Sequence, residues 1–178
     1  MRQVYKRSVV AVVVALALAV GGYLVWRPTD ESRIRGQLTR LAAAVRITDS
    51  DQQANPVERL ARVSGQLDGL FDPEARVNIP ELTDLTSEHA GRRELAQLVA
   101  AAPQYVCTFA VDFTSVTIKM DPAHTTAFVG ATASVSADER DGSTSQDRRA
   151  VDFHFVEKDG AWVIRTLTVW TKEDSAPP

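Results

Sequence analysis

Residues 151–164 read VDFHFVEKDGAWVI, and this stretch decides the fold of the C-terminal half of the chain. Apolar side chains occupy every second position from Val151 to Phe155, and Asp152 and His154 lie between them. Side chains two apart on a strand share a face, so this pattern predicts a strand with one buried and one polar face. The sequence KDG that follows predicts a tight hairpin turn into another strand.

The same period of two continues on both sides of this stretch, beyond Pro103. It predicts three more strands, over residues 105–113, 125–136 and 162–171. The charged segment 137–145 is predicted to be a hairpin loop between two of the strands. Clean alternation of apolar and polar residues is typical of an antiparallel sheet with one buried face.

The N-terminal half shows helical spacing instead. Three helices are predicted, over residues 29–45, 55–71 and 92–102, with one short strand over residues 75–79. The second helix has a strong start signal, because Asn55 is a preferred N-cap residue and a proline follows it at the first helical position. Helices followed by a run of strands indicate an α+β fold.

Residues 8–26 carry no charge and predict a transmembrane helix that serves as a signal anchor. As a helix they span about 28 Å, close to the roughly 30 Å hydrocarbon core of a bilayer. The basic residues 1–7 should stay in the cytoplasm, so the C-terminal domain should be periplasmic or extracellular. The alternative is a cleaved signal peptide, with a cleavage site at residues 17–19. We expect the folded domain to span residues 27–172 and the acidic residues 173–178 to form a flexible tail.

The composition excludes several classes of function. The 178 residues are 44% hydrophobic and 24% charged, as in ordinary globular proteins. Beyond residue 26 there are 17 basic and 23 acidic side chains, a balance that argues against nucleic-acid binding. The one cysteine, Cys107, excludes a disulfide scaffold and lies among apolar residues, so we expect a buried thiol. The three histidines lack metal-ligand spacing and no glycine-rich phosphate loop occurs, so we expect neither a metal nor a cofactor.

The order of the predicted helices and strands, together with several short motifs, resembles that of the nuclear transport factor 2-like superfamily. The motifs are LFDP at residues 70–73, VNIP at 77–80, GRREL at 91–95 and FVEKDGAWVI at 155–164. The resemblance implies an α+β cone in which three helices pack on a curved antiparallel sheet. Members with one N-terminal span and one such domain are similar to small components of envelope transport or secretion machines.

The superfamily includes ketosteroid isomerase-like enzymes, which use an Asp general base and an oxyanion hole made of a Tyr and a protonated Asp. By position, the resemblance places the base at Ile79 and the oxyanion Asp at Val151, and the first predicted helix contains no Tyr. A register shift of one would put Asp152 at the oxyanion position, but it would also turn the apolar side chains of that strand outward. The residues therefore disfavour an isomerase.

A dehydratase-like site would need a His–Asp pair on one face of the sheet. Asp152 and His154 point the same way, and Asp112 could join them, with His154 as the base. The same three residues also fit the polar outer face of a half-exposed sheet, which is the interpretation we favour. We therefore expect no catalytic residue.

A second hypothesis is a pocket for a hydrophobic small ligand inside the cone. Its lining would consist of apolar side chains from the first short strand and from the sheet, namely Phe71, Ile79, Phe109, Phe153 and Phe155. The same side chains could instead fill a closed core, and close packing favours that alternative.

Taken together, the residues favour a non-enzymatic, membrane-anchored domain that acts as a protein-binding or assembly module of a bacterial cell-envelope system. It would contact the bilayer through residues 8–26 and a protein partner or a second copy of itself through its domain. The interface candidates are Arg148, Arg149 and Trp170. Because Trp162 and Trp170 are an even number of positions apart, the sequence predicts that Trp170 shares a strand face with Trp162, which is a predicted core residue. The alternatives are the hydrophobic ligand pocket and a SnoaL-like or ketosteroid isomerase-like enzyme.

Overall fold

The computed structural model describes residues 29–79 and 90–170. Contacts within the chain divide it into two units, Met1–Ser32 and Arg33–Pro178, and the fold given below is that of the second unit. In the described part of the chain, no helix combines the length and the apolar character needed to cross a membrane.

Three of the predicted segments cannot be compared with the structure. These are the basic N-terminus (residues 1–7), the transmembrane helix (8–26) and the acidic tail (173–178), all of which lie outside the described residues. The anchor therefore stays a prediction from the sequence.

The described residues form four α-helices, α2 (Asp30–Val45), α3 (Asp49–Gln53), α4 (Pro56–Asp68) and α6 (Arg92–Ala101). Three of them match the predicted helices. The fourth, α3, begins after Thr48, whose backbone N–H donates a hydrogen bond to Asp51 Oδ2 at 3.0 Å. The predicted start of α4 is confirmed, because Asn55 Oδ1 accepts a hydrogen bond from the N–H of Val57 at 2.9 Å.

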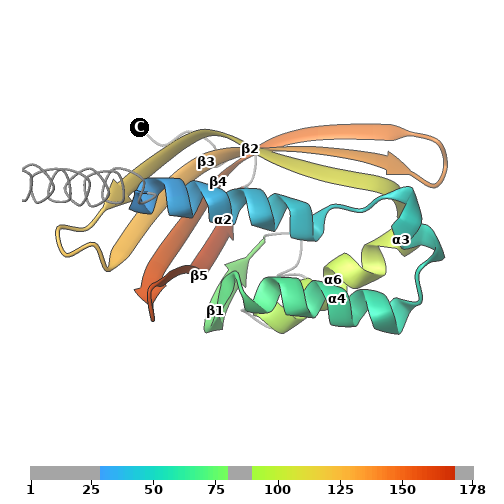
Figure 1. The fold of residues 1–178 in the computed structure, drawn as a ribbon. Helices are drawn as coiled ribbons and strands as arrows, with labels where there is room; N and C mark the ends of the chain where they lie inside the picture. The colour runs from blue at the N-terminus through green and yellow to red at the C-terminus, as the bar shows by residue number, and fades with distance from the viewer. Residues whose placement is uncertain (1–28, 80–89, 171–178) are drawn as a thin grey trace, which may run out of the picture. The chain divides into compact units, whose positions relative to one another are not determined.

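The described strands are β1 (Phe71–Asn78), β2 (Val106–Met120), β3 (Thr126–Glu139), β4 (Thr144–Lys158) and β5 (Ala161–Val169). They form one curved sheet in the order β1-β5-β4-β3-β2 (Figure 1). β2 to β5 are antiparallel neighbours, but β1 pairs with β5 in parallel. The sheet is therefore mixed, which corrects the wholly antiparallel sheet predicted from the alternation. β1 is parallel to β5 because the chain crosses from β1 through α6 to β2 at the opposite edge of the sheet. Three hairpins, β2 to β5, then bring the chain back beside β1.

The two hairpins next to β4 show why its register is well defined. Lys158 pairs with Ala161, and the two turn residues Asp159 and Gly160 have φ values of 51° and 80°. Positive φ at both positions is the geometry that an Asp-Gly pair favours, so the predicted tight turn is confirmed. At the other end of β4, Asp138 pairs with Thr144, so the strands extend into the segment that the sequence predicts to be a loop.

Irregularities in β2 and β5 change which side chains face the core. The pairing shifts next to Cys107 and Ser115 in β2 and next to Arg165 in β5. An extra residue in one strand moves all the following side chains to the other face. Trp170 therefore lies on the outer face and Trp162 in the core, although their spacing predicts a shared face. Cys107 is only half-buried for the same reason, not buried as predicted.

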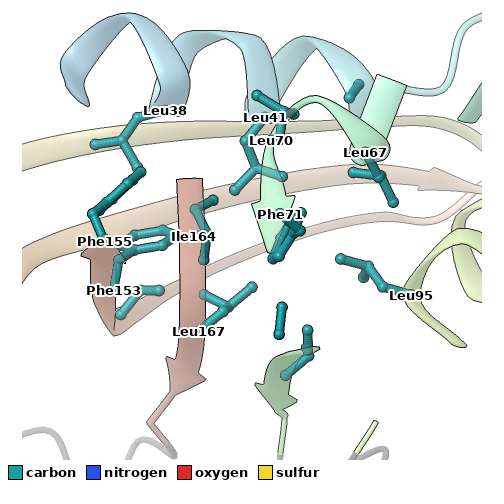
Figure 2. Close-up of a cluster of buried hydrophobic side chains, with 14 of the residues drawn as sticks. Leu38, Leu41, Leu67, Leu70, Phe71, Leu95, Phe153, Phe155, Ile164 and Leu167 are labelled. Carbon is teal, nitrogen blue, oxygen red and sulfur yellow. The ribbon is translucent and has the colours of Figure 1, made fainter. Parts of the chain in front are cut away.

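The hydrophobic core lies between the helices and the inner face of the sheet (Figure 2). Its largest side chains are aromatic and at most 1% exposed, namely Phe71, Phe153, Phe155 and Trp162. Leu38 and Leu41 of α2 and Leu67 of α4 belong to the same cluster. The predicted inward orientation of the strand face that carries Phe153 and Phe155 is thus confirmed, as is the burial of Trp162.

Arg59 of α4 is also buried, which the apolar pattern does not indicate. Its guanidinium donates hydrogen bonds to the backbone carbonyls of Asp51 at 2.6 Å, Ala54 at 2.9 Å and Ala100 at 2.8 Å. These carbonyls lie in or just after α3 and near the C-terminal end of α6, where the helix dipole favours a positive charge. Arg59 therefore holds α3, α4 and α6 together.

Candidate functional site

A cavity of about 320 Å³ lies between the helices α2 and α6 and the inner face of the sheet. The helical wall consists of Leu41 and Val45 from α2 and of Leu95, Leu98 and Val99 from α6. These side chains are three or four residues apart, so they share one face of each helix. The volume falls at the lower end of the range of small-molecule sites, which starts at about 300 Å³.

The opposite wall is formed by strand side chains that point to the helices. Phe109 and Val111 of β2, Val135 of β3 and Leu167 of β5 are among them. Val111 and Val135 are direct cross-strand neighbours. Leu167 also belongs to the core cluster, as does Leu95 on the helical wall (Figure 2), so the cavity borders the core directly.

Two charged side chains of β4, Asp147 and Arg149, interrupt this apolar lining. Arg149 Nε lies 2.8 Å from Asp147 Oδ2, and the backbone N–H of Arg148 donates to Asp147 Oδ1, also at 2.8 Å. The two side chains are about a quarter exposed, 25% for Arg149 and 26% for Asp147. The ion pair offsets part of the cost of placing two charges beside an apolar surface.

The predicted interface pair Arg148 and Arg149 is divided between the two faces of the sheet. Neighbouring residues on a strand point to opposite faces. Arg149 therefore faces the cavity together with Val151, whereas Arg148 is exposed on the outer face in a groove that Asp112 also lines. Trp170, the third interface candidate, lies on the outer face as well and is 39% exposed.

Two of the five predicted pocket residues, Ile79 and Phe109, line the cavity. The other three, Phe71, Phe153 and Phe155, lie in the closed core and not in the cavity wall. Phe153 and Phe155 pack against one another with ring centroids 6.0 Å apart. They lie further along β4 than Val151, which lines the cavity, and belong to the core cluster.

The three weak catalytic candidates lie on the outer face of the sheet, away from the cavity. Asp152 is exposed and accepts a hydrogen bond from the indole Nε1 of Trp170 at 2.7 Å. His154 stacks on Phe128, with ring centroids 4.6 Å apart and an interplanar angle of 10°. Asp112 is exposed and pairs with Ser134 across the strands, far along the sheet from the other two. The geometry does not bring the three together as an acid–base cluster.

The two positions that the resemblance assigns to catalytic carboxylates, Ile79 and Val151, do line the cavity. Both carry apolar side chains, and from the first helix only Leu41 and Val45 reach the wall. Among the described residues these two positions of the wall are therefore apolar, and its charged side chains, Asp147 and Arg149, lie at other positions, on β4.

The described carboxylates with a shifted pKa stabilise turns and strand ends and do not line the cavity. The N–H of Glu74 is the main cause that lowers the pKa of Asp72, and the N–H of Thr126 is the main cause that lowers the pKa of Asp121. Within residues 29–79 and 90–170, no group of three or more His, Cys, Asp or Glu side chains is placed to hold a metal ion.

Sequence reasoning did not identify Leu98, Asp147 and Arg149 as cavity residues. A signal for two of them was present, because Asp147 and Arg149 have the same parity as Val151 and Phe153 on an uninterrupted strand. Charged residues at inward-facing positions of a strand are candidates for a functional wall. For Leu98, helical spacing alone could not show which neighbour it would contact.

Comparison of the sequence with protein-family models and with curated proteins gives no match. Solved structures do match the fold. A protein from Kribbella flavida superposes with a TM-score of 0.62 at 11% identity, covering 81% of this chain and 91% of that chain. A proposed scytalone dehydratase from Novosphingobium aromaticivorans gives a TM-score of 0.59 at 14% identity, with 80% and 84% covered. A nuclear transport factor 2-like superfamily protein from Salmonella enterica gives 0.56 at 14% identity, with 77% and 87% covered.

The chain therefore has the nuclear transport factor 2-like fold, with helices packed on a curved sheet of five strands in mixed order. The identities of these neighbours are all below 25%, so the likeness concerns the fold alone. The names of the neighbours include an enzyme, but the activity of this chain has to be argued from its own residues.

Proposed function

We propose that this domain binds a small, largely apolar molecule in the cavity between α2, α6 and the sheet. The observation that carries the proposal is the apolar lining of a space of about 320 Å³ that borders a well-packed core. An apolar space of this size, with one charged pair among the described residues of its wall, has the character of a ligand site.

The same residues favour binding over catalysis. Acid–base chemistry needs a titratable group within hydrogen-bond reach of the ligand. In the described part of the chain, the charged groups in the wall are Asp147 and Arg149, which form an ion pair with one another. The positions of the catalytic carboxylates in the isomerase-like enzymes hold Ile79 and Val151. We therefore propose a non-enzymatic binding domain.

The experiment is a titration of the purified full chain with a fluorescent apolar dye, comparing wild type with Val135→Phe. The larger side chain would occupy part of the cavity, so dye affinity should fall at least about tenfold. The control is Val156→Phe, which adds the same volume at a half-buried position on the outer face of β4. Equal dye affinity of wild type and Val135→Phe, with both proteins folded, would contradict the proposal.

The outer face of the sheet favours a second candidate function, that of a protein-binding or assembly module. Phe128 is 61% exposed and stacks on His154, and Trp170 is 39% exposed and bonded to Asp152. Exposed aromatic side chains held in fixed positions are typical of protein interfaces. We propose that a protein partner or a second copy of the chain contacts this face.

We also propose that residues 8–26 anchor the protein in a bacterial cell membrane and that the domain lies on the outward side of that membrane. The apolar length and the basic residues before it support this topology. Crosslinking of the full chain in its native membrane, from a photoreactive residue at position 128, tests both proposals. Labelled partners or crosslinked copies are expected, and recovery of the uncrosslinked protein in the soluble fraction would contradict both.

A further inference from the structure

We propose that a second copy of the chain pairs with this one along the outer edge of β2, strand to strand and antiparallel. β2 ends the sheet on the side opposite β1, so one of its two edges has no neighbouring strand among the described residues (Figure 1). A strand edge with unpaired backbone groups is a template for a further strand. This edge is a different surface from the cavity and from the outer face of the sheet, so the inference goes beyond the proposed function.

The hydrogen bonds of β2 show which backbone groups point to this edge. Phe109 exchanges two hydrogen bonds with Ile47, at 2.9 and 3.1 Å, on the side away from β3. Backbone groups alternate in direction along a strand, so those of Phe113 point the same way. A bulge near the middle of β2 adds one residue, after which even positions such as Ile118 point to the edge. Within residues 29–79 and 90–170, the N–H and C=O groups of Phe113 and Ile118 have no hydrogen-bond partner on this edge.

The helix α2 leaves this edge open. A groove of about 280 Å³ lies between the two, lined by Leu38 of α2 and by Phe113 and Val116 of β2, among others. Arg35, which also lines the groove, donates a hydrogen bond from Nη2 to the carbonyl of Val116 at 3.1 Å. The apolar side chains of Phe113, Val116 and Ile118 are only half-buried. A strand added beside β2 would cover them, and burial of apolar surface is the dominant driving force of association.

The charges of β2 select one register for such a pair. Residues 112–119 read DFTSVTIK, with an acidic side chain at the first position and a basic one at the last. Asp112 and Lys119 are both exposed on the outer face of the sheet, and neither has a hydrogen bond or ion pair with another described side chain. When two copies run antiparallel and in register over this segment, Asp112 of each copy lies opposite Lys119 of the other. Opposite charges at such positions stabilise a strand pair, and like charges destabilise it.

The other pairs of this register are complementary as well. Phe113 lies opposite Ile118 on the inner face, and Thr114 lies opposite Thr117 on the outer face. Since Phe113 and Ile118 carry the backbone groups that point to the edge, they exchange hydrogen bonds across the pair. The two bulges lie opposite one another at the two-fold axis, so the alternation of faces is kept through the centre. One patch therefore serves both copies, as in other two-fold contacts.

The experiment is sedimentation equilibrium of the purified full chain in detergent over a range of protein concentrations. Wild type should form a dimer. Asp112→Lys or Lys119→Asp alone places like charges opposite one another, twice in each dimer, and should raise the Kd at least about tenfold. The double variant Asp112→Lys/Lys119→Asp exchanges the charges and should return the Kd to within about threefold of wild type. Urea unfolding of protein diluted below this Kd reports on the single chain and not on these pairs.

Two further variants separate this contact from other causes. Arg93→Glu changes the net charge as much as Lys119→Asp does, at an exposed position of α6, and should leave the Kd unchanged. Phe128→Ala removes an exposed aromatic side chain from the outer face and should also leave the dimer intact. Dissociation by Phe128→Ala but not by the charge reversals would place the contact on the outer face and overturn the inference. A wild type that stays monomeric at every concentration, or a double variant that does not recover, would overturn it as well.

Discussion

Trp170 and Asp152 join the end of β5 to the middle of β4 on the outer face of the sheet, through a hydrogen bond of 2.7 Å between the indole Nε1 and a carboxylate oxygen. Trp170 continues the pairing of β5 with β4 at its backbone, because its N–H donates to the carbonyl of Ala150 at 3.0 Å. One predicted interface residue is therefore held by one predicted catalytic candidate, and the bond gives Asp152 a structural role.

A double-mutant cycle measures this bond. Trp170→Phe keeps a ring and removes the N–H, and Asp152→Ala removes the acceptor. Each single change should lower the free energy of unfolding by about 1 kcal/mol or less, because the site is exposed. The coupling energy should be about 0.5–1 kcal/mol, and it can be measured by urea unfolding. Strict additivity of the two changes would show that the bond does not form in solution.

Phe155 and His154 are neighbours on β4 with opposite environments, since Phe155 is 0% exposed and His154 is half-buried on the outer face. Phe155→Ala opens a cavity in the core and should destabilise the fold by about 3–5 kcal/mol. His154→Ala loses only the stack on Phe128 and should cost about 0.5–1 kcal/mol. Chemical denaturation of both variants checks the assignment of faces, and equal losses would reverse it.

Arg59→Lys tests the link between α3, α4 and α6. A lysine has one ammonium group and cannot serve three carbonyls in different directions, so buried acceptors lose their donors. The expected loss of stability is about 2–3 kcal/mol. Arg62→Lys is the matched control, because Arg62 lies on the same helix, is 43% exposed and pairs with Asp51. It should cost at most about 1 kcal/mol.

Asp72 makes stability depend on pH. It is 5% exposed and accepts a hydrogen bond from the N–H of Glu74 at 2.9 Å, and Lys158 Nζ lies 3.4 Å from its other oxygen. The Glu74 N–H lowers its pKa most and Lys158 lowers it further, against the opposing effect of burial. A carboxyl with a lowered folded pKa stabilises the fold above its unfolded pKa of about 3.9, and this contribution is lost as the pH falls through the folded pKa.

Asp72→Asn should therefore destabilise the domain by about 1–2 kcal/mol at neutral pH. The difference from wild type should shrink once the pH falls below about 3.9, where Asp72 of the unfolded chain becomes protonated, and should be lost as the pH falls through the lowered pKa of the folded state. Urea unfolding at neutral and at acidic pH measures both values. Asp112→Asn is the exposed control and should change stability by less than about 0.5 kcal/mol at either pH. A difference for Asp72→Asn that does not vary with pH would contradict this account.

The periodic spacing of apolar residues predicts the helices and the long strands, because each element buries one of its faces and the residues on that face recur at a fixed spacing. It could also have predicted the irregularities of β2, where apolar residues change from odd positions such as Phe113 to even ones such as Val116 and Ile118. The same change occurs in β5 between Ile164 and Leu167. The change is not predicted when each strand is assumed to keep the same period of two along its whole length.

The parallel position of β1 and the cavity could not be predicted in this way. Both depend on how distant elements meet. The sequence of β1 contains Asp72 and Pro73 near its start, and its pattern does not indicate which strand it pairs with. The cavity is the space left between α2, α6 and four strands, so the sequence of any one of these elements cannot predict it. Of the predicted pocket residues, Ile79 and Phe109 lie at its wall, whereas three others fill the core beside it.

The parallel pairing of β1 with β5 has a consequence for the order in which the protein can fold. Phe71 pairs with Ile164, about 90 residues later in the chain, so β1 cannot join the sheet until the last strand is available. Contacts so distant in sequence slow folding, since a long loop must close before they form. A chain emerging from the ribosome or crossing a membrane would complete the antiparallel hairpins of β2 to β5 first. It would bring β1 into the sheet only at the end, and until then its aggregation-prone edge would be open to other proteins.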